Sequence, residues 1–296
     1  MFSPIQFAFE NITTDTIHLF EKKGISMSVL RLDKIHSVIS GNKWFKLQHY
    51  LKEAKEQSKK TIVTSGGAYS NHIVATAAVC KLYGFASIGI IRGKKPVLLS
   101  PSLLQAREYG MQLHFISRED YGYKKLPAGL QNDDYYFINE GGYGKKGAEG
   151  ASKILNYSIY DFTHCCCAVG TGTMMAGLIN AVSPGQKVIG ISVMKNNYDL
   201  ENNVLSLTGF EKKEWQIIHD YHFGGYAKYK PELIRFMNEF YRQTNIPSDF
   251  VYTGKLFYAI TNMAENNFFS AGSRLLLIHS GGLQGNRSLG EGVLMF

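Results

Sequence analysis

The chain has 296 residues, of which 45% are hydrophobic and 19% charged, a composition typical of globular proteins with a sizeable core and not of disordered ones. Its net charge is +8 and its pI is near 9.1, but lysine pairs are spread along the whole sequence, which argues against a single nucleic-acid-binding stripe. The excess of positive charge is compatible with binding of anionic small molecules.

The amino terminus and the cysteines indicate a compartment. The first twelve residues lack the basic and apolar regions of a signal peptide, and no apolar run approaches the ~18 residues of a membrane span. Cys165, Cys166 and Cys167 are adjacent, so they would point to alternate faces of a strand and cannot form a disulfide framework. We expect a soluble cytoplasmic protein with reduced thiols. His164 lacks the spacing of a zinc ligand, and no metal site is predicted.

Short apolar, β-branched runs alternate with helical patterns along the chain. The expected strands are Met27–Leu32, Thr61–Thr64, Ser87–Ile91, Leu113–Ile116, Tyr135–Ile138, Cys165–Val169, Val188–Val193 and Arg274–His279. This alternation predicts parallel βαβ units and an α/β architecture.

Helical spacings of three and four fall between these runs. They are found after Lys43 (Trp44, Leu47, Leu51, Ala54) and after Pro231 (Leu233, Phe236, Met237, Phe240), and two further helices are expected over Ile73–Tyr83 and from about Met174.

Loop signals are densest over 121–150 and 196–203. The first loop is a plausible crossing between two domains. We therefore expect a small α/β domain over residues 46–152, and a large domain made of residues 1–45 and 153–296.

The stretch SGNKWFKL, residues 40–47, places Lys43 at the start of an apolar-faced helix behind a small, flexible turn. A lysine held there can be desolvated and become nucleophilic. We predict that Lys43 carries a cofactor aldehyde as a Schiff base. Lys46 lies inside the same helix and is expected to be a surface residue with its ammonium in solvent.

The stretch SGGAYSNH, residues 65–72, follows a strand and precedes an alanine-rich helix. Its free backbone N–H groups and short polar side chains at a helix start suit an anion such as a carboxylate. The alternative is that Ser70 or Asn71 only caps the helix.

A second strand-to-helix turn contains Gly170, Thr171, Gly172 and Thr173. Successive N–H groups and threonine hydroxyls at this position can bind a phosphate. The stretch fits neither the GxGxxG fingerprint nor a Walker loop, and the next strand runs into Met194 and not into an acidic residue, so a single phosphate fits better than a dinucleotide.

Two further junctions, Val251–Lys255 and Ile278–Gly282, carry hydroxyls beside glycines. Ligands of open α/β sheets bind outside the carboxyl ends of the strands, although turn chemistry alone explains Gly281 and Gly282. His279 ends an apolar strand and is expected to be a satisfied core histidine.

Taken in order, the motifs SGNKWFKL, SGGAYSNH, GTGTMMAG, HFGGYAKY, VYTGKLFY and IHSGG resemble the pyridoxal-phosphate enzymes of the 1-aminocyclopropane-1-carboxylate (ACC) deaminase and D-cysteine desulfhydrase family. The resemblance extends from about residue 25 to the end. It implies a tryptophan synthase β-like fold of two open, mostly parallel sheets, with the active site in the cleft between them.

The resemblance also implies roles for individual residues. Lys43 would be the Schiff-base lysine and the base for the α-proton. The substrate carboxylate would be held by Ser70, Asn71 and His72, beside Tyr69, and the rest of the substrate would face Tyr226 and Tyr252. The cofactor would be held at its ring oxygen by Asn71, at its ring nitrogen by Thr253, with Ser280 nearby, and at its phosphate by Gly170, Thr171, Gly172 and Thr173.

This chain departs from the family pattern at several positions. Thr253 replaces the glutamate that contacts the ring nitrogen in the deaminases, which weakens the ring as an electron sink. Ser280 stands where the deaminases tend to have leucine, Phe45 replaces a basic residue, and Tyr69 adds an aromatic residue. The first two changes favour β-elimination over cyclopropane opening.

The favoured interpretation is a lyase that acts on a D-amino acid, with D-cysteine as the expected substrate and pyruvate, sulfide and ammonia as the products. The alternatives are an ACC deaminase, which would produce 2-oxobutyrate and ammonia, and a non-catalytic protein that binds a phosphate ligand. A homodimer is expected from base rates.

Overall fold

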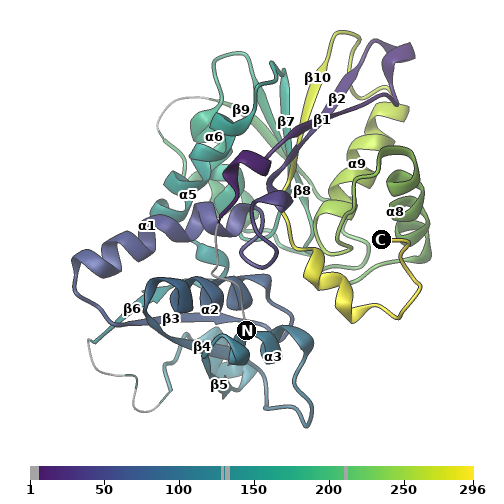
Figure 1. The fold of residues 1–296 in the computed structure, drawn as a ribbon. Helices are drawn as coiled ribbons and strands as arrows, with labels where there is room; N and C mark the ends of the chain where they lie inside the picture. The colour runs from purple at the N-terminus through teal and green to yellow at the C-terminus, as the bar shows by residue number, and fades with distance from the viewer. Residues whose placement is uncertain (1–6, 128–129, 131–133, 210–212) are drawn as a thin grey trace.

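The computed structural model describes residues 7–127, 130, 134–209 and 213–296. These residues form two mostly parallel sheets with helices packed on their faces (Figure 1). The larger sheet has the order β1 (Thr14–Ile17), β2 (Ser26–Arg31), β10 (Arg274–His279), β7 (His164–Val169), β8 (Lys187–Ser192), β9 (Glu214–Ile218). The smaller sheet has the order β5 (Gln112–Ile116), β4 (Ala86–Arg92), β3 (Thr61–Gly66), β6 (Tyr135–Ile138).

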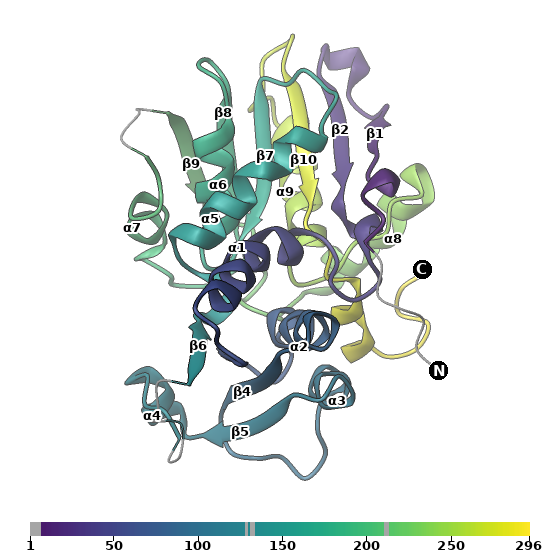
Figure 2. The ribbon, with the colours of Figure 1, turned by 60° about the vertical axis from the view of Figure 1, so that its left-hand side comes forward.

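All pairs in both sheets are parallel except β1 with β2. The α/β architecture and the eight predicted strands are therefore confirmed, with ends shifted by up to two residues. Because β10 pairs with β2, the last strand lies beside the first parallel strand, as Figure 2 shows. This pairing brings residues near 40 and near 280 together.

Helices α5 (Lys145–Ser152) and α6 (Thr173–Ala181) cover one face of the larger sheet, and α8 (Pro231–Thr244) and α9 (Thr253–Glu265) cover the other (Figure 1). Helices α2 (Asn71–Tyr83) and α3 (Pro101–Glu108) pack together beside the smaller sheet. The remaining helices include α4 (Arg118–Gly122), α7 (Leu200–Leu205) and the 3-10 turns η3 (Leu32–Ile35), η4 (Glu140–Gly142) and η6 (Leu283–Ser288). In the described part of the chain, no helix is long and apolar enough to cross a membrane.

Helix α1 (Asn42–Glu56) lies between the two sheets (Figure 2). Its Phe45 packs into the core of the larger sheet, whereas Leu47 and Leu51 pack into the core of the smaller one. Its predicted start near Lys43 is confirmed.

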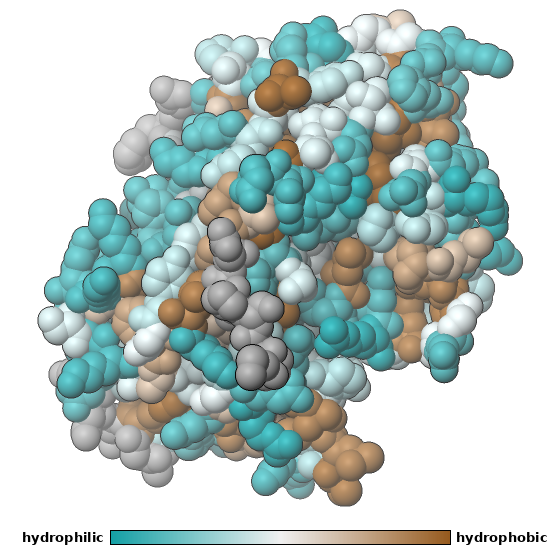
Figure 3. All heavy atoms as spheres, in the orientation of Figure 1, coloured by the Kyte–Doolittle hydropathy of each residue, from teal (hydrophilic) through white to brown (hydrophobic). Residues whose placement is uncertain are grey.

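Hydrophilic side chains cover most of the face shown in Figure 3, with hydrophobic ones in small groups.

Among the described residues, two strands (β1 and β9) and five helices (α3, α4, α5, α7 and α9) were not predicted. Strand β1 is a short edge strand of sequence TDTI, and β9 reads EWQII, so neither presents a long apolar run. Helix α5 falls inside the expected loop 121–150, part of which (128–129 and 131–133) lies outside the described residues, and α7 begins inside the expected loop 196–203.

The glycines that suggested a loop in α5 permit close helix packing. A Cβ on Gly150 would lie 1.8 Å from the carbonyl oxygen of Phe45 in α1, and one on Gly147 would lie 2.1 Å from that of Gly142. Glycine at these positions therefore lets two backbones touch.

Candidate active site

A cavity of about 880 Å³ opens between the carboxyl ends of the two sheets. Residues from both sheets line it, including most of the predicted site residues: Lys43, Ser70, Asn71, His72, Gly170, Thr171, Gly172, Tyr226, Tyr252 and Ser280. The size is ample for a cofactor together with a small substrate. Three predicted residues, Tyr69, Thr173 and Thr253, are not among those that line it.

Lys43 is positioned by two turns packed against each other. Gly41 has a φ of 64°, and a Cβ there would lie 1.8 Å from the carbonyl oxygen of Ser280. The Asn42 N–H donates to that same oxygen at 3.3 Å, and the Gly282 N–H donates to Oγ of Ser40 at 3.3 Å. The turn after β10 and the turn before α1 therefore fix the position of Lys43.

The Lys43 ammonium is largely removed from solvent. Burial lowers its pKa to about 8, and the negative charge of Asp249 opposes this shift. Its Nζ donates to Oδ1 of Asn42 at 2.7 Å and lies 5.8 Å from the ring centroid of Tyr252. The sequence prediction of a desolvated lysine agrees with this geometry, and a useful fraction of the amine is neutral near pH 8.

The loop 65–72 joins β3 to α2 as predicted. Oγ of Ser70 accepts from the N–H of Ile73 at 3.3 Å, so Ser70 does cap the helix. Ser70 and Asn71 also face the cavity, and Oδ1 of Asn71 is buried without a partner among the described residues. The capping and ligand-binding interpretations are thus compatible. Tyr69 is 51% exposed and lies outside the cavity lining.

The His72 ring has a defined tautomer. Oγ1 of Thr64 donates to the carbonyl oxygen of Ile138 at 2.7 Å, so it must accept from Nε2–H of His72 at 2.8 Å. Nδ1 is then an unprotonated acceptor, and it has no partner in the described structure. Burial and the neighbouring Lys46 and Lys43 hold the pKa of His72 well below its usual value, which keeps the ring neutral.

The glycine-threonine turn lies at the start of α6. Gly172 has a φ of 86°, and a Cβ there would meet the Val204 side chain at 2.8 Å. Oγ1 of Thr173, which is fully buried, lies 3.1 Å from Oγ1 of Thr171. The first N–H groups of a helix lack intrahelical partners, so this turn offers the donors that a phosphate requires.

Tyr226 and Tyr252 form one wall of the cavity, with ring centroids 6.1 Å apart in an edge-to-face arrangement. Burial raises the pKa of both phenols, and the neighbouring Tyr226 raises that of Tyr252 further. Both therefore stay protonated and can donate a hydrogen bond.

Thr253 begins α9 and is fully buried. Its hydroxyl donates to Oδ1 of Asp249 at 2.7 Å and accepts from the Asp249 N–H at 2.8 Å. Contact between Thr253 and a ring nitrogen stays a prediction. Ser280 lines the cavity and presents the hydroxyl that is accessible from it.

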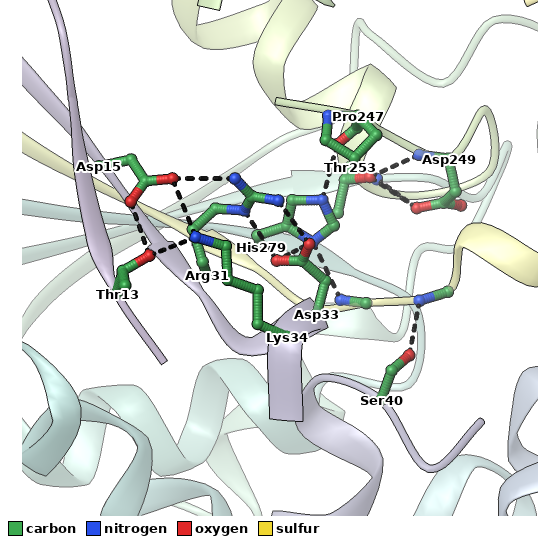
Figure 4. Close-up of polar contacts among 12 residues, drawn as sticks. Thr13, Asp15, Arg31, Asp33, Lys34, Ser40, Pro247, Asp249, Thr253 and His279 are labelled. Carbon is green, nitrogen blue, oxygen red and sulfur yellow. Dashed lines mark hydrogen bonds and ion pairs between the residues drawn. The ribbon is translucent and has the colours of Figure 1, made fainter. Parts of the chain in front are cut away.

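The sequence reasoning missed Asp249. Its carboxylate accepts from the N–H groups of Val251, Tyr252 and Thr253 at 2.9–3.0 Å, at the start of α9. Figure 4 shows its contacts with Thr253. Asp249 lies four residues before the first residue of α9, outside the N-cap position, so the usual capping signal does not identify it. It also supplies the negative charge that acts on Lys43.

A network of polar side chains surrounds His279 at the end of β10 (Figure 4). Arg31 binds Asp33 through two hydrogen bonds of 2.9 and 2.7 Å, and Oδ1 of Asp33 lies 3.4 Å from Nδ1 of His279. His279 also donates from Nε2 to the carbonyl oxygen of Pro247 at 2.8 Å. The prediction of a satisfied core histidine is confirmed.

The expectation for Lys46 is wrong, because the structure buries it. Only 5% of the residue is exposed, and its Nζ donates to the carbonyl oxygen of Gly141 in η4. Burial and the charge of Lys43 lower its pKa well below its usual value. The available signal was its position three residues after Lys43, on the same helix face.

Comparison with known proteins agrees with this arrangement. Residues 17–281 match the family model described as pyridoxal-phosphate dependent enzyme. A putative ACC deaminase of Thermotoga maritima is 30% identical, over 90% of this chain and 92% of its own. A mitochondrial bifunctional D-cysteine desulfhydrase/ACC deaminase of Arabidopsis thaliana is 30% identical, over 88% of this chain and 73% of its own.

Among solved structures, an ACC deaminase homologue superimposes with a TM-score of 0.80 at 24% identity, covering 95% of this chain and 93% of that one. This likeness shows the fold that the motifs implied. The extent of the family match and the two relatives at 30% identity lead to one conclusion: the chain belongs to the pyridoxal-phosphate-dependent enzymes, in the group that includes the ACC deaminases and D-cysteine desulfhydrases.

Proposed function

We propose that this enzyme is a lyase that removes sulfide from D-cysteine, releasing pyruvate and ammonia. The observation that carries the proposal is that Thr253 and Ser280, neither of which has a carboxylate, stand where the resemblance implies a glutamate and often a leucine in the deaminases. Ser280 lines the cavity, and the Thr253 hydroxyl is bonded to Asp249. Expulsion of a thiolate demands less electron withdrawal than cyclopropane opening does.

The residues present fit pyridoxal phosphate. The turn at Gly172 offers backbone donors for a phosphate, and Oδ1 of Asn71 and Nδ1 of His72 are buried acceptors without partners among the described residues. Lys43 offers a partly neutral amine. When bound, the cofactor supplies an electron sink for negative charge on the substrate Cα.

The chain's own residues then have distinct tasks. The Ser70 hydroxyl and the backbone N–H groups of Asn71 and His72 hold the substrate carboxylate at the start of α2, where the helix dipole favours an anion. Nζ of Lys43 accepts the α-proton. The Cβ–S bond breaks with its electron pair leaving on sulfur, and Tyr226 or Tyr252 donates a proton to it. Water then converts the released enamine to pyruvate and ammonia.

The attachment of the cofactor is tested by borohydride treatment of the purified enzyme followed by peptide mass spectrometry. We expect the cofactor mass on the peptide containing Lys43 and its loss, with the visible absorbance band, in Lys43→Ala. An unmodified peptide would instead favour the non-catalytic phosphate-binding alternative.

A second candidate is ACC deamination, the activity for which the Thermotoga relative is named and one of the two for which the Arabidopsis relative is named. The two reactions are separated by assaying sulfide from D-cysteine and 2-oxobutyrate from ACC side by side, with L-cysteine, D-serine and β-chloro-D-alanine in the panel. A higher kcat/KM with ACC than with D-cysteine would overturn the preferred function.

We further propose a cytoplasmic homodimer, to be checked by light scattering and fractionation. The proposed domains are 46–152, and 1–45 with 153–296. All four strands of the smaller sheet lie within 61–138, which supports this division.

A further inference from the structure

Arg92 occupies a defined place along the cavity. The carboxyl ends of the smaller sheet follow one another in the order β6, β3, β4, β5. The β6 end lies at the phosphate turn, since a Cβ on Gly141 would be 2.7 Å from the Thr171 side chain. The β3 end carries the loop with Ser70, and Arg92 ends β4, one strand further along. Arg92 thus lies beyond the carboxylate loop, on the side away from the phosphate turn.

Arg92 is exposed, and its guanidinium contacts an aromatic ring. It lies over the ring of Tyr121 at 5.4 Å, and the Tyr121 hydroxyl is anchored to Oε2 of Glu140 at 2.8 Å. Its Nη2 is 3.6 Å from where a Cβ on Gly67 would be. Among the described residues, no carboxylate lies within ion-pair distance of Arg92.

The cavity as a whole has an excess of positive charge. Its described lining includes five lysine and arginine side chains, Lys43, Lys46, Arg92, Lys124 and Lys125, and one carboxylate, Glu140. Lys125 is paired with Asp120 at 2.7 Å, and Lys43 and Lys46 lie by the cofactor site. A cofactor phosphate and a substrate carboxylate have donors elsewhere, which leaves Arg92 and Lys124, and of these Arg92 lies at the end of a strand of the sheet.

Arg92 lines the same cavity as Tyr226, which belongs to the substrate wall. Burial raises the pKa of Tyr226, and the positive charge of Arg92 is among the influences that lower it.

Resting on the function proposed above, we propose that Arg92 is a specificity-determining residue that recognises the β-substituent of the substrate. The substrate class is then amino acids whose β-substituent is anionic or departs as an anion. When the Cβ–X bond breaks, its electron pair leaves on X, and the guanidinium stabilises the negative charge that develops there. ACC places no such charge at this position.

The test is a binding measurement on the cofactor-loaded enzyme with two matched ligands, D-aspartate and D-asparagine, which differ in the charge of the β-substituent. We expect the wild type to bind D-aspartate roughly 5- to 20-fold more tightly by calorimetry, since the pair is charge-assisted but partly exposed to solvent. In Arg92→Met the ratio should fall to about one, and in Arg92→Lys part of it should remain.

Arg118→Met is the matched control, because Arg118 is exposed on α4 and does not line the cavity; it should keep the wild-type ratio. No preference in the wild type, or an unchanged ratio in Arg92→Met, would overturn the proposal. Equal weakening of both ligands would also overturn it and would place Arg92 on the α-carboxylate. Sulfide release from D-cysteine is measured separately, so failure of the lyase function is distinguishable from failure of the Arg92 assignment.

Discussion

The pKa of Lys43 is lowered by burial, and the negative charge of Asp249 opposes this shift. Removing that charge in Asp249→Asn should destabilise the ammonium and lower the Lys43 pKa further from its value of about 8. The measurement is the pH dependence of acylation of the cofactor-free enzyme, followed on the Lys43 peptide by mass spectrometry. An apparent pKa near 10.5 in the wild type would contradict the structure.

Asp33 is the residue for which pH dependence is best defined. Burial alone would raise its pKa, but His279 and Arg31 lower it overall. A carboxylate with a depressed pKa stabilises the fold above its unfolded pKa of about 3.9, and this contribution is lost as the pH falls through the lower folded value.

Asp33→Asn should therefore cost about 3 kcal/mol of unfolding free energy at pH 7, with the difference from wild type shrinking below about pH 4. Urea unfolding at pH 7, 5 and 3.5 provides the measurement. The exposed pair of Lys187 and Glu214 is the control, and Glu214→Gln should leave stability nearly unchanged.

Sequence patterns at the residue scale located Lys43 because a turn and a helix start are local features. They failed for Lys46, because η4, which buries it, comes from about 95 residues further along the chain. They also gave no reason to select Arg92, whose partner Tyr121 lies on another element.

At the element scale, α5 depends on glycine where it touches α1. Gly150→Ala should destabilise the protein by about 2–3 kcal/mol, because the added methyl group would overlap the Phe45 carbonyl. Gly122→Ala in α4 has open space around it and should be nearly neutral. Thermal unfolding of both variants tests this, and equal stability would argue against the close packing.

Strands with long apolar runs were predictable because burial on both faces demands such runs. The two strands that were missed lie at the edges of the larger sheet, β1 and β9, where polar residues are tolerated. Helix α5 was hidden because glycine is both a loop signal and the residue that allows backbones to touch.

At the scale of the whole molecule, the cavity joins residues from both sheets, so the bound cofactor should stabilise them together. Removing pyridoxal phosphate should lower Tm by roughly 5–10 °C, as expected for a ligand present at about a hundred times its Kd. Calorimetry of the enzyme before and after treatment with hydroxylamine checks this. Readdition of cofactor should restore Tm in the wild type but only in part in Lys43→Ala.

The arrangement of the strands in space could not be derived from periodicity, which predicts elements but not their neighbours. The two-sheet arrangement was implied only by the resemblance. In the larger sheet, for example, β10 pairs with β2, and the paired residues are almost 250 positions apart in the sequence.

Helix α1 inserts Phe45 into one core and Leu47 into the other, and the expected domain boundary between residues 45 and 46 passes through it. If the chain were divided there, each fragment would keep an apolar helix face with nothing to cover it. The two halves should therefore fold only in each other's presence, and the lysine at the head of α1 should acquire its low pKa only when both have assembled.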